Sequence, residues 1–198
     1  TKLPQKGDFS VTYSGQVQVT TPDLSSYRLL NASEKLLLEH DAGYYNNNPS
    51  LYKSRWDRVD NGLNTDWLNI PTRTGVGSKH SLSLEGGDDD INYGVDFSYN
   101  DIEGVMKGSN RKNANFGGYI SARMKNIVIN NYLSYIKSEA SNSTYGSFSE
   151  YARQNPYWNP YDSVTGGMAR ILEEYTYQGN TVKYYNPAYN GTISTTDE

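Results

Sequence analysis

The chain has 198 residues, no cysteine and a formal net charge of -4 at pH 7. This length suits one ordinary domain, and nothing in the sequence points to a disulfide framework or to thiol chemistry. The acidic balance argues against a nucleic-acid partner. Only 35% of the residues are hydrophobic, but 13% are aromatic, which is not the composition of a disordered chain.

No apolar run approaches the roughly 18 to 20 residues of a membrane-spanning helix, so the sequence excludes a helical membrane protein. It does not exclude a transmembrane β-barrel. The strands of such a barrel alternate between lipid-facing and lumen-facing side chains, and its loops are polar, so the average composition stays hydrophilic.

The first elements are a strand, a short helix and an irregular stretch. Residues 9–20 alternate with period two, which predicts a β-strand. Asn31 and Glu34 have the spacing of a capping box, and we expect one short helix over residues 32–40. Residues 44–77 show no sustained period, and we interpret them as an ordered loop anchored by tryptophans.

Four more strands are predicted from the alternation that returns after residue 80; they cover residues 81–85, 91–100, 115–125 and 127–137. The turns at 86–90 and at Asn126 are tight, whereas 104–113 is longer and 138–198 reads as loop. Short turns on one side and long loops on the other are typical of an outer-membrane barrel. We therefore divide the chain into an entry segment (1–79), four barrel strands (80–137) and an extracellular loop region (138–198).

The composition of the two strand faces favours lipid over a protein core. In the clearest strand, one face carries only Ile91, Tyr93, Val95, Phe97 and Tyr99, and the other carries polar residues and glycine, including Asp96 and Asn100. Alternation alone also fits a soluble β-sandwich, in which the apolar face is a core. We interpret the apolar face as facing lipid and the polar face as lining an aqueous lumen.

The sequence also resembles a known family through segments that occur in the family's order along nearly the whole chain. These are Thr21-Pro22-Asp23-Leu24, Tyr27-Arg28-Leu29-Leu30-Asn31-Ala32, Asp66-Trp67, His80-Ser81-Leu82-Ser83-Leu84-Glu85-Gly86-Gly87, Glu103-Gly104-Val105-Met106-Lys107-Gly108-Ser109, Asn155-Pro156-Tyr157 and Tyr185-Asn186-Pro187. With these segments the chain resembles the SusC/RagA family of TonB-dependent outer-membrane transporters of Bacteroidetes.

The resemblance implies an all-β fold. We expect a partial transmembrane antiparallel β-barrel, made of the first strands of a 22-stranded barrel, with one short helix and long extracellular loops. The implied function is import of an oligosaccharide or a peptide across the bacterial outer membrane, with a SusD-like surface lipoprotein as lid. TonB would act through a segment that this chain does not contain. The alternative is a soluble, secreted carbohydrate-binding β-domain or adhesin.

We predict no enzyme activity, no cofactor and no metal site. The two histidines, His40 and His80, lie far apart in the sequence, so no catalytic constellation forms around them. The acidic run Asp88-Asp89-Asp90 does not have the spacing of a known calcium loop, and we interpret it as a solvated turn.

Tyr157, Trp158 and Tyr161 form the densest aromatic cluster in the region expected to lie outside the cell. Flat aromatic faces stack on sugar rings or peptide groups, so these residues are candidates for contact with a ligand or a partner. The alternative is that they pack against their own protein. We expect all three to be buried in the assembled complex, and their replacement by serine to loosen lid docking without disturbing the barrel strands.

Overall fold

The computed structural model describes residues 9–189, so the ends of the predicted entry segment (1–8) and of the predicted loop region (190–198) lie outside the described residues. The chain forms two compact units. The first, here called the sheet unit, contains residues up to 21 together with 74–142. The second, here called the loop unit, contains residues 22–73 and those from 143 onward.

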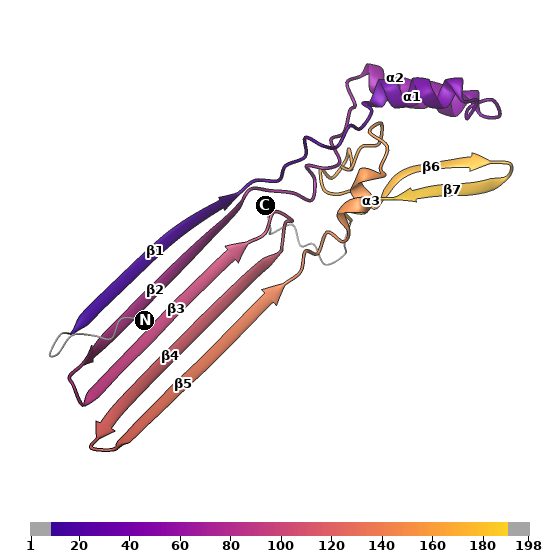
Figure 1. The fold of residues 1–198 in the computed structure, drawn as a ribbon. Helices are drawn as coiled ribbons and strands as arrows, with labels where there is room; N and C mark the ends of the chain where they lie inside the picture. Colours follow the sequence, from indigo (N-terminus) through magenta and orange to yellow (C-terminus); the bar gives the residue numbers. More distant parts are fainter. Residues whose placement is uncertain (1–8, 190–198) are drawn as a thin grey trace. The chain divides into compact units, whose positions relative to one another are not determined.

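The sheet unit is one antiparallel sheet of five strands, which lie side by side in sequence order (Figure 1). The strands are β1 (Ser10–Thr20), β2 (Gly75–Gly87), β3 (Ile91–Glu103), β4 (Asn110–Met124) and β5 (Ile127–Ser141). Within the described residues β1 and β5 each pair on one side only, so the sheet is open. This confirms the prediction of a mostly-β fold whose sheet is part of a barrel.

All five predicted strands are present, and β2, β3, β4 and β5 extend further than predicted toward the end of the sheet away from the tight turns. β2 begins at Gly75, and β3 ends at Glu103. The sequence did not indicate these extensions because alternation stops there: glycines occupy one face of β2, and β4 opens with polar residues on both faces. Backbone hydrogen bonding to the neighbouring strand continues regardless of side-chain type.

The two tight turns lie at the same end of the sheet (Figure 1). Between β2 and β3, the Asp88 carboxylate accepts hydrogen bonds from the backbone N–H groups of Asp90 (2.9 Å) and Ile91 (2.8 Å). This is the behaviour of a turn aspartate. Between β4 and β5 only Lys125 and Asn126 intervene, with Lys125 at a positive φ of 51°. The longer connections start at the opposite strand ends, as expected.

The loop unit contains three helices and a hairpin: α1 (Ala32–Asp41), α2 (Pro49–Asp60), α3 (Phe148–Ala152), β6 (Ile171–Tyr177) and β7 (Asn180–Tyr185). The predicted capping box at the start of α1 is present. The Asn31 carboxamide oxygen accepts from the Glu34 N–H at 2.9 Å, and the Glu34 carboxylate accepts from the Asn31 N–H at 3.0 Å. These bonds satisfy backbone donors that the first helical turn leaves free.

The prediction of a single helix, with residues 44–77 as loop, was wrong about α2. This helix starts after an Asn48 cap with Pro49 in its first turn, a recognised start signal. Its apolar period is weak because the residues it buries are Leu51 and a charged one, Arg55. The hairpin β6–β7 was also expected to be loop; its turn residues, Gln178 and Gly179, lack the familiar Asn-Gly signature although both have positive φ.

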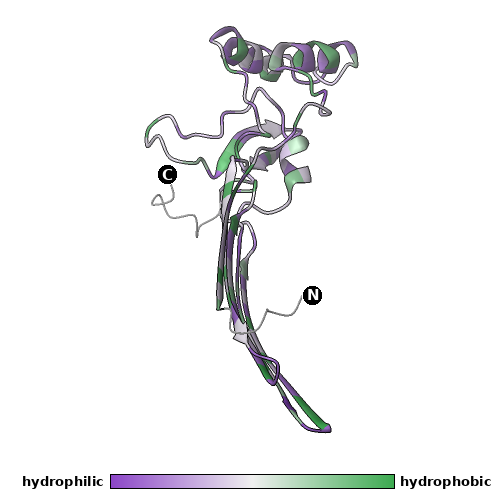
Figure 2. Ribbon diagram, turned by 60° about the vertical axis from the view of Figure 1, so that its left-hand side comes forward, coloured by the Kyte–Doolittle hydropathy of each residue, from purple (hydrophilic) through white to green (hydrophobic). Residues whose placement is uncertain are grey.

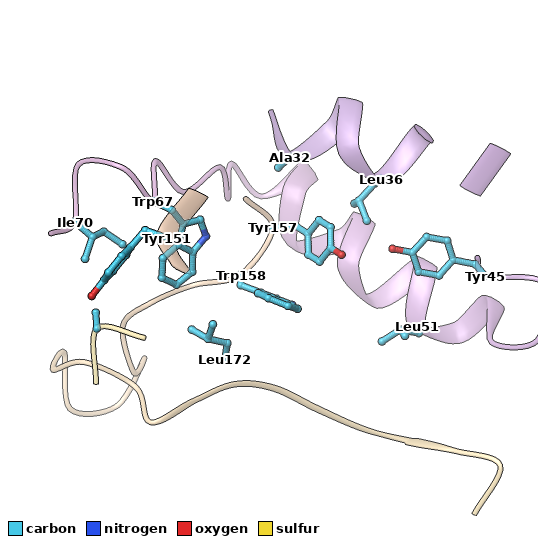
Figure 3. Close-up of a cluster of buried hydrophobic side chains, with 11 residues drawn as sticks. Ala32, Leu36, Tyr45, Leu51, Trp67, Ile70, Tyr151, Tyr157, Trp158 and Leu172 are labelled. Carbon is cyan, nitrogen blue, oxygen red and sulfur yellow. The ribbon is translucent and has the colours of Figure 1, made fainter. Parts of the chain in front are cut away.

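The hydrophobic core lies in the loop unit (Figure 3). Its buried members come from both long segments of the chain and are Ala32, Leu36, Tyr45, Leu51, Trp67, Ile70, Tyr151, Tyr157, Trp158, Leu172 and Ala188. No residue of β1 to β5 belongs to this cluster. The loop unit is therefore folded around its own core, whereas the sheet unit depends on strand pairing.

Close strand packing at one glycine generates a first prediction. A Cβ at Gly75 would collide with the backbone carbonyl of Glu103, whereas a Cβ at Gly118 would meet only the Gly94 carbonyl oxygen at 3.6 Å. We expect Gly75→Ala to destabilise the sheet by about 1 to 3 kcal/mol, because backbone atoms must move apart, and Gly118→Ala to have little effect. Urea unfolding of the detergent-solubilised protein measures the difference. Equal unfolding midpoints would contradict this packing.

Candidate functional site

The strand register gathers apolar side chains on one face of the sheet. Tyr13 pairs with Leu82, Leu82 with Phe97, Phe97 with Phe116, and Phe116 with Tyr135. Paired residues point to the same side, so one row of large side chains crosses all five strands. The apolar face comprises this row and Val11, Val17, Val19, Val76, Leu84, Ile91, Tyr93, Val95, Tyr99, Ala114, Ile120, Ala122, Met124, Ile127, Ile129 and Leu133. Figure 2 shows the hydropathy along these strands.

The apolar face is exposed. Val17 is 72% exposed, Tyr13 is 65% exposed and Leu133 is 61% exposed. Soluble monomers rarely leave apolar patches larger than a few hundred Å² open to water. Exposing this surface to water costs about 25 cal/mol per Å². The face therefore requires apolar surroundings.

On β2 to β5 a polar row crosses the apolar face near the long connections, whereas on β1 Val17 occupies this row, and Val19 and Val76 lie beyond it. In this row Ser78 pairs with Asp101, Asp101 with Lys112, and Lys112 with Glu139. The Lys112 ammonium lies 3.4 Å from the Asp101 carboxylate. On β3, the stretch whose alternate residues belong to the apolar face runs from Ile91 to Tyr99. It is nine residues long and precedes the polar row. Transmembrane β-strands need about 9 to 11 residues to cross a bilayer.

The opposite face is polar and carries most of the serine, asparagine and glutamine side chains of the sheet. Neighbouring strands exchange hydrogen bonds there: Asn115 donates to Ser98 at 3.2 Å, and Ser121 donates to Asn130 at 2.7 Å. Asp96 and Asn100 share this face, as predicted from their position in β3. The exceptions are Ile102 of β3, Tyr119 of β4 and, on β5, Val128, Tyr132 and Ile136, which all stand on the polar face.

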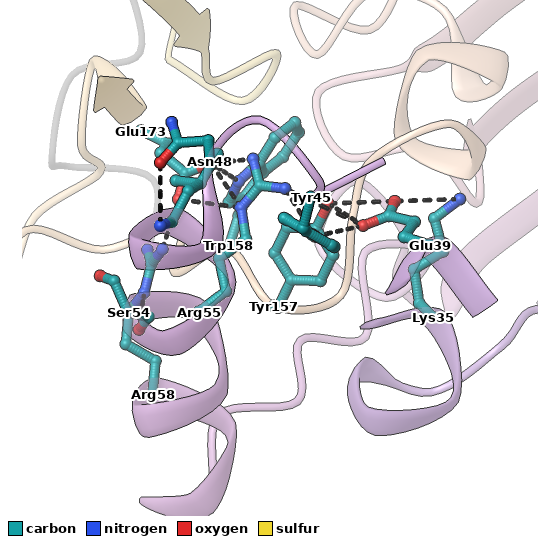
Figure 4. Close-up of polar contacts among 11 residues, drawn as sticks. Lys35, Glu39, Tyr45, Asn48, Ser54, Arg55, Arg58, Tyr157, Trp158 and Glu173 are labelled. Atoms are coloured by element: carbon teal, nitrogen blue, oxygen red, sulfur yellow. Dashed lines mark hydrogen bonds and ion pairs between the residues drawn. The ribbon is translucent and has the colours of Figure 1, made fainter. Parts of the chain in front are cut away.

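The loop unit is centred on a buried ion pair between α2 and β6 (Figure 4). Arg55 is 1% exposed, and its guanidinium contacts the Glu173 carboxylate at 2.5 Å. Arg58 also donates to Glu173, and the Trp158 indole N–H donates to it at 2.9 Å. Burial pushes the pKa of Glu173 upward, but the hydrogen bonds and charge of the arginines outweigh burial and hold that pKa below its usual range.

Aromatic rings surround the Arg55 guanidinium. Its central carbon lies 4.7 Å from the ring centroid of Tyr157 and 5.5 Å from that of Tyr45, within the range of cation–π attraction. Both phenol groups donate to the Glu39 carboxylate, at 3.0 Å and 2.5 Å respectively. Burial raises the pKa of each phenol, so both stay neutral donors. The cluster thus ties α1 and α2 to residues more than one hundred positions later.

The structure divides the predicted aromatic site. Tyr157 is 1% exposed and Trp158 is 4% exposed, and both belong to the core of the loop unit. Tyr161 is 49% exposed. Replacing all three by serine would remove two core side chains. The triple variant would therefore lose folding stability of the loop unit, and a loss of docking could not be assigned to the surface. Tyr161 alone remains a surface candidate for ligand or partner contact, and that role stays a prediction.

Sequence reasoning missed Arg55 and Glu173. Each is a charged residue in a polar stretch, which normally indicates a solvated position. They are 118 positions apart, so no local spacing pattern connects them. Only the fold brings them together.

Within residues 9–189, no group of three or more metal-ligating side chains is placed to hold a metal ion. Among the helices of the same residues, none has the length and apolar character needed to cross a membrane.

No protein-family model and no curated protein matches the chain. The chain does match solved structures. The RagAB peptide importer in its "closed-closed" state is 18% identical with a TM-score of 0.69, over 96% of this chain and 25% of that one. A structure of the RagAB peptide transporter is 19% identical with a TM-score of 0.66, over 94% of this chain and 24% of that one. The chain thus spans about a quarter of their length and shares the fold of that part.

The face assignment can be tested by moving charge between the two faces of β3. We expect Val95→Arg to cost about 2 to 4 kcal/mol if residue 95 lies near the bilayer midplane, because the new charge would enter hydrocarbon. Asp96→Asn keeps a polar group on the polar face and should be mild. Refolding into lipid vesicles measures both. Equal tolerance of the two substitutions would defeat the assignment.

Removing one partner of the buried ion pair should destabilise the loop unit. We expect Glu173→Gln to cost about 3 to 5 kcal/mol, because it removes the carboxylate closest to the buried Arg55 charge and leaves only Glu39, 3.9 Å away. Glu174→Gln is the matched control: Glu174 is exposed and pairs with Lys183 at 3.1 Å, and a surface pair contributes about 0 to 1 kcal/mol. Protease resistance of the loop unit in increasing urea provides the readout. Similar losses in both variants would contradict a buried pair.

The same pair predicts a pH dependence. The folded-state pKa of Glu173 is lowered, so its stabilising contribution is present above the pKa of the unfolded chain, near 4.5, and is lost as the pH falls through the lower folded value. Below about pH 4.5, the stability of the loop unit should therefore fall more steeply with decreasing pH in the native protein than in the Glu173→Gln variant. Parallel pH profiles would show that Glu173 is not charged in the folded chain.

Proposed function

We propose that the chain forms part of the barrel wall of a bacterial outer-membrane importer of the TonB-dependent, SusC/RagA type. The observation that carries the proposal is the exposed apolar face, which crosses five paired strands and on β3, β4 and β5 ends at a polar row. Lipid is the surrounding that such a face requires. The polar face would then line the lumen, where hydroxyl and amide groups are solvated.

The open sheet supports a barrel that continues beyond these strands. An unpaired edge strand in a bilayer leaves backbone N–H and C=O groups without hydrogen bonds, at a cost of several kcal/mol each. β1 and β5 therefore need further strands beside them in the membrane. The likeness to the RagAB importer, whose chain is about four times as long, supports the same arrangement.

The long connections would lie outside the cell, and the tight turns at Asp88 and Asn126 would face the periplasm, because outer-membrane barrels keep short periplasmic turns and long external loops. The loop unit is then a surface structure suited to contact a SusD-like lipoprotein lid and the incoming oligosaccharide or peptide. In this proposal the chain serves transport rather than catalysis, and energy arrives through TonB by way of another segment.

The alternative, a soluble carbohydrate-binding β-domain or adhesin, would need a cover for the apolar face. A β-sandwich supplies that cover with a second sheet. The other sheet in the described part of the chain is the β6–β7 hairpin, and two strands of seven and six residues are too small to cover the apolar face of five strands of 11 to 15 residues. This observation favours the membrane.

Cysteine labelling on intact cells tests the topology without background from other cysteines in this chain. A membrane-impermeant maleimide should label Val164→Cys, in the exposed 161–168 turn, and should label Asn126→Cys only after the outer membrane is permeabilised. Fractionation should place the protein in the outer membrane, with release by detergent. Labelling of residue 126 alone on intact cells would reverse the topology, and a soluble native protein would refute the proposal.

A further inference from the structure

A groove of about 650 Å³ lies entirely within the loop unit. Its walls are the segment 24–31 with the first turn of α1, residues 64–68, and residues 152–156 at the end of α3. The volume falls within the range of ligand pockets, about 300 to 1,000 Å³. Neither the apolar face nor the buried ion pair contributes to it, so its role is separate from theirs.

The groove carries positive charge on a negative chain. Arg28, Lys35 and Arg153 line it, opposed by Asp66, whereas the whole chain has a net charge of -4. Lys35 pairs with Glu39 at 3.4 Å, and the Asp66 carboxylate accepts from its own loop. Within the part of the chain that the structure describes, neither Arg28 nor Arg153 makes an ion pair or a side-chain hydrogen bond. Two guanidinium groups are thus available to an anionic ligand.

One wall of the groove offers free backbone groups. The Tyr27 N–H donates to the Leu24 carbonyl at 3.1 Å, and the Asn31 N–H donates to Glu34 at 3.0 Å. Between these bonds, the backbone groups of Arg28, Leu29 and Leu30 have no hydrogen-bond partner among residues 9–189. Leu29 is 52% exposed and Leu30 is 42% exposed. A run of unpaired backbone groups of this kind can accept a further strand, as in β-strand addition.

Amide groups complete the groove. The Asn64 carboxamide oxygen accepts from the Ala32 N–H at 3.0 Å, which fixes the side chain and leaves its NH₂ group available. The Trp67 indole N–H donates to the Asn155 backbone carbonyl at 2.8 Å, which holds that segment in place. In the described chain the Asn155 side chain has no hydrogen-bond partner. Carboxamides in this setting suit the carbonyl and N–H groups of a peptide.

We propose that this groove binds a free, extended, acidic peptide of about four or five residues. The peptide backbone pairs with Arg28 to Leu30, its carboxylates contact Arg28 and Arg153, and its alternate apolar side chains lie against Leu24 and Leu29. A peptide explains both observations, the cations and the unpaired backbone run. Sugar hydroxyls can also hydrogen-bond the backbone run, but only a peptide repeats N–H and C=O groups at the spacing of a strand, and a neutral oligosaccharide leaves the cations unused. Binding here can be measured without transport, so it stands or falls separately from the barrel-wall function.

Fluorescence anisotropy with the detergent-purified native protein tests the charge requirement. The probe is fluorescein-labelled Asp-Leu-Asp-Leu-Asp, and the neutral control is Asn-Leu-Asn-Leu-Asn. We expect the acidic probe to bind at least tenfold more tightly. Arg28→Gln with Arg153→Gln should weaken its binding at least tenfold without shifting the urea midpoint, because both side chains are exposed. Arg170→Gln removes an exposed arginine outside the groove and should change nothing.

A second arm tests the backbone requirement. Two versions of the acidic probe carry N-methyl groups on alternate amides, one on the odd-numbered and one on the even-numbered amides. Only one edge of the peptide pairs with the groove, so one of these two probes should bind at least tenfold more weakly. Equal binding of the acidic and neutral probes, or unchanged binding to the double arginine variant, would overturn the proposal. If oligogalacturonate displaces the probe and both N-methylated probes bind as well as the unmethylated one, the peptide assignment is overturned in favour of an acidic sugar.

Discussion

Strand register is the constraint on which the sheet unit depends. The side-chain period of a strand is two, so a slip of one residue in β3 would move Asp96 and Asn100 to the apolar face and Val95 and Phe97 to the polar face. The observed pairing avoids this on β3 and keeps large side chains together in the row that runs from Tyr13 to Tyr135, whereas Asn131 and Lys137 interrupt the apolar face on β5. Because the sheet buries no core of its own, in the proposed function register and a surrounding lipid phase together replace the packing that stabilises a soluble domain.

The loop unit, unlike the sheet unit, is stabilised by a buried core. It buries tyrosine and tryptophan around the Arg55–Glu173 pair, and each polar atom in that centre has a partner. Ordering two long connections costs conformational entropy, and a core that draws on both of them offsets that cost. A loop unit that folds around its own core can hold a groove in fixed geometry, whereas a flexible loop would lose conformational entropy on each binding event.

The sequence predicted the sheet well because alternation is a local signal and every strand carries it. The cap of α1 was equally local, with both partners three positions apart. The loop unit was largely missed. α2 buries a charge, so its apolar period is weak, and the β6–β7 turn lacks a common signature. Tyr157 and Trp158 were recognised as important aromatic residues, but exposure depends on distant partners such as Glu39 and Glu173, which no local pattern identifies.

In the proposed barrel wall, alternate residues of β3 face lipid and water, and spin labelling measures this most directly. The chain has no cysteine, so a nitroxide can be attached to single cysteines at positions 92, 93, 95, 96, 97 and 98. In lipid bilayers, labels at 93, 95 and 97 should collide preferentially with dissolved oxygen, and labels at 92, 96 and 98 with a polar nickel complex. Equal access of the nickel complex to both sets would contradict a membrane-facing surface.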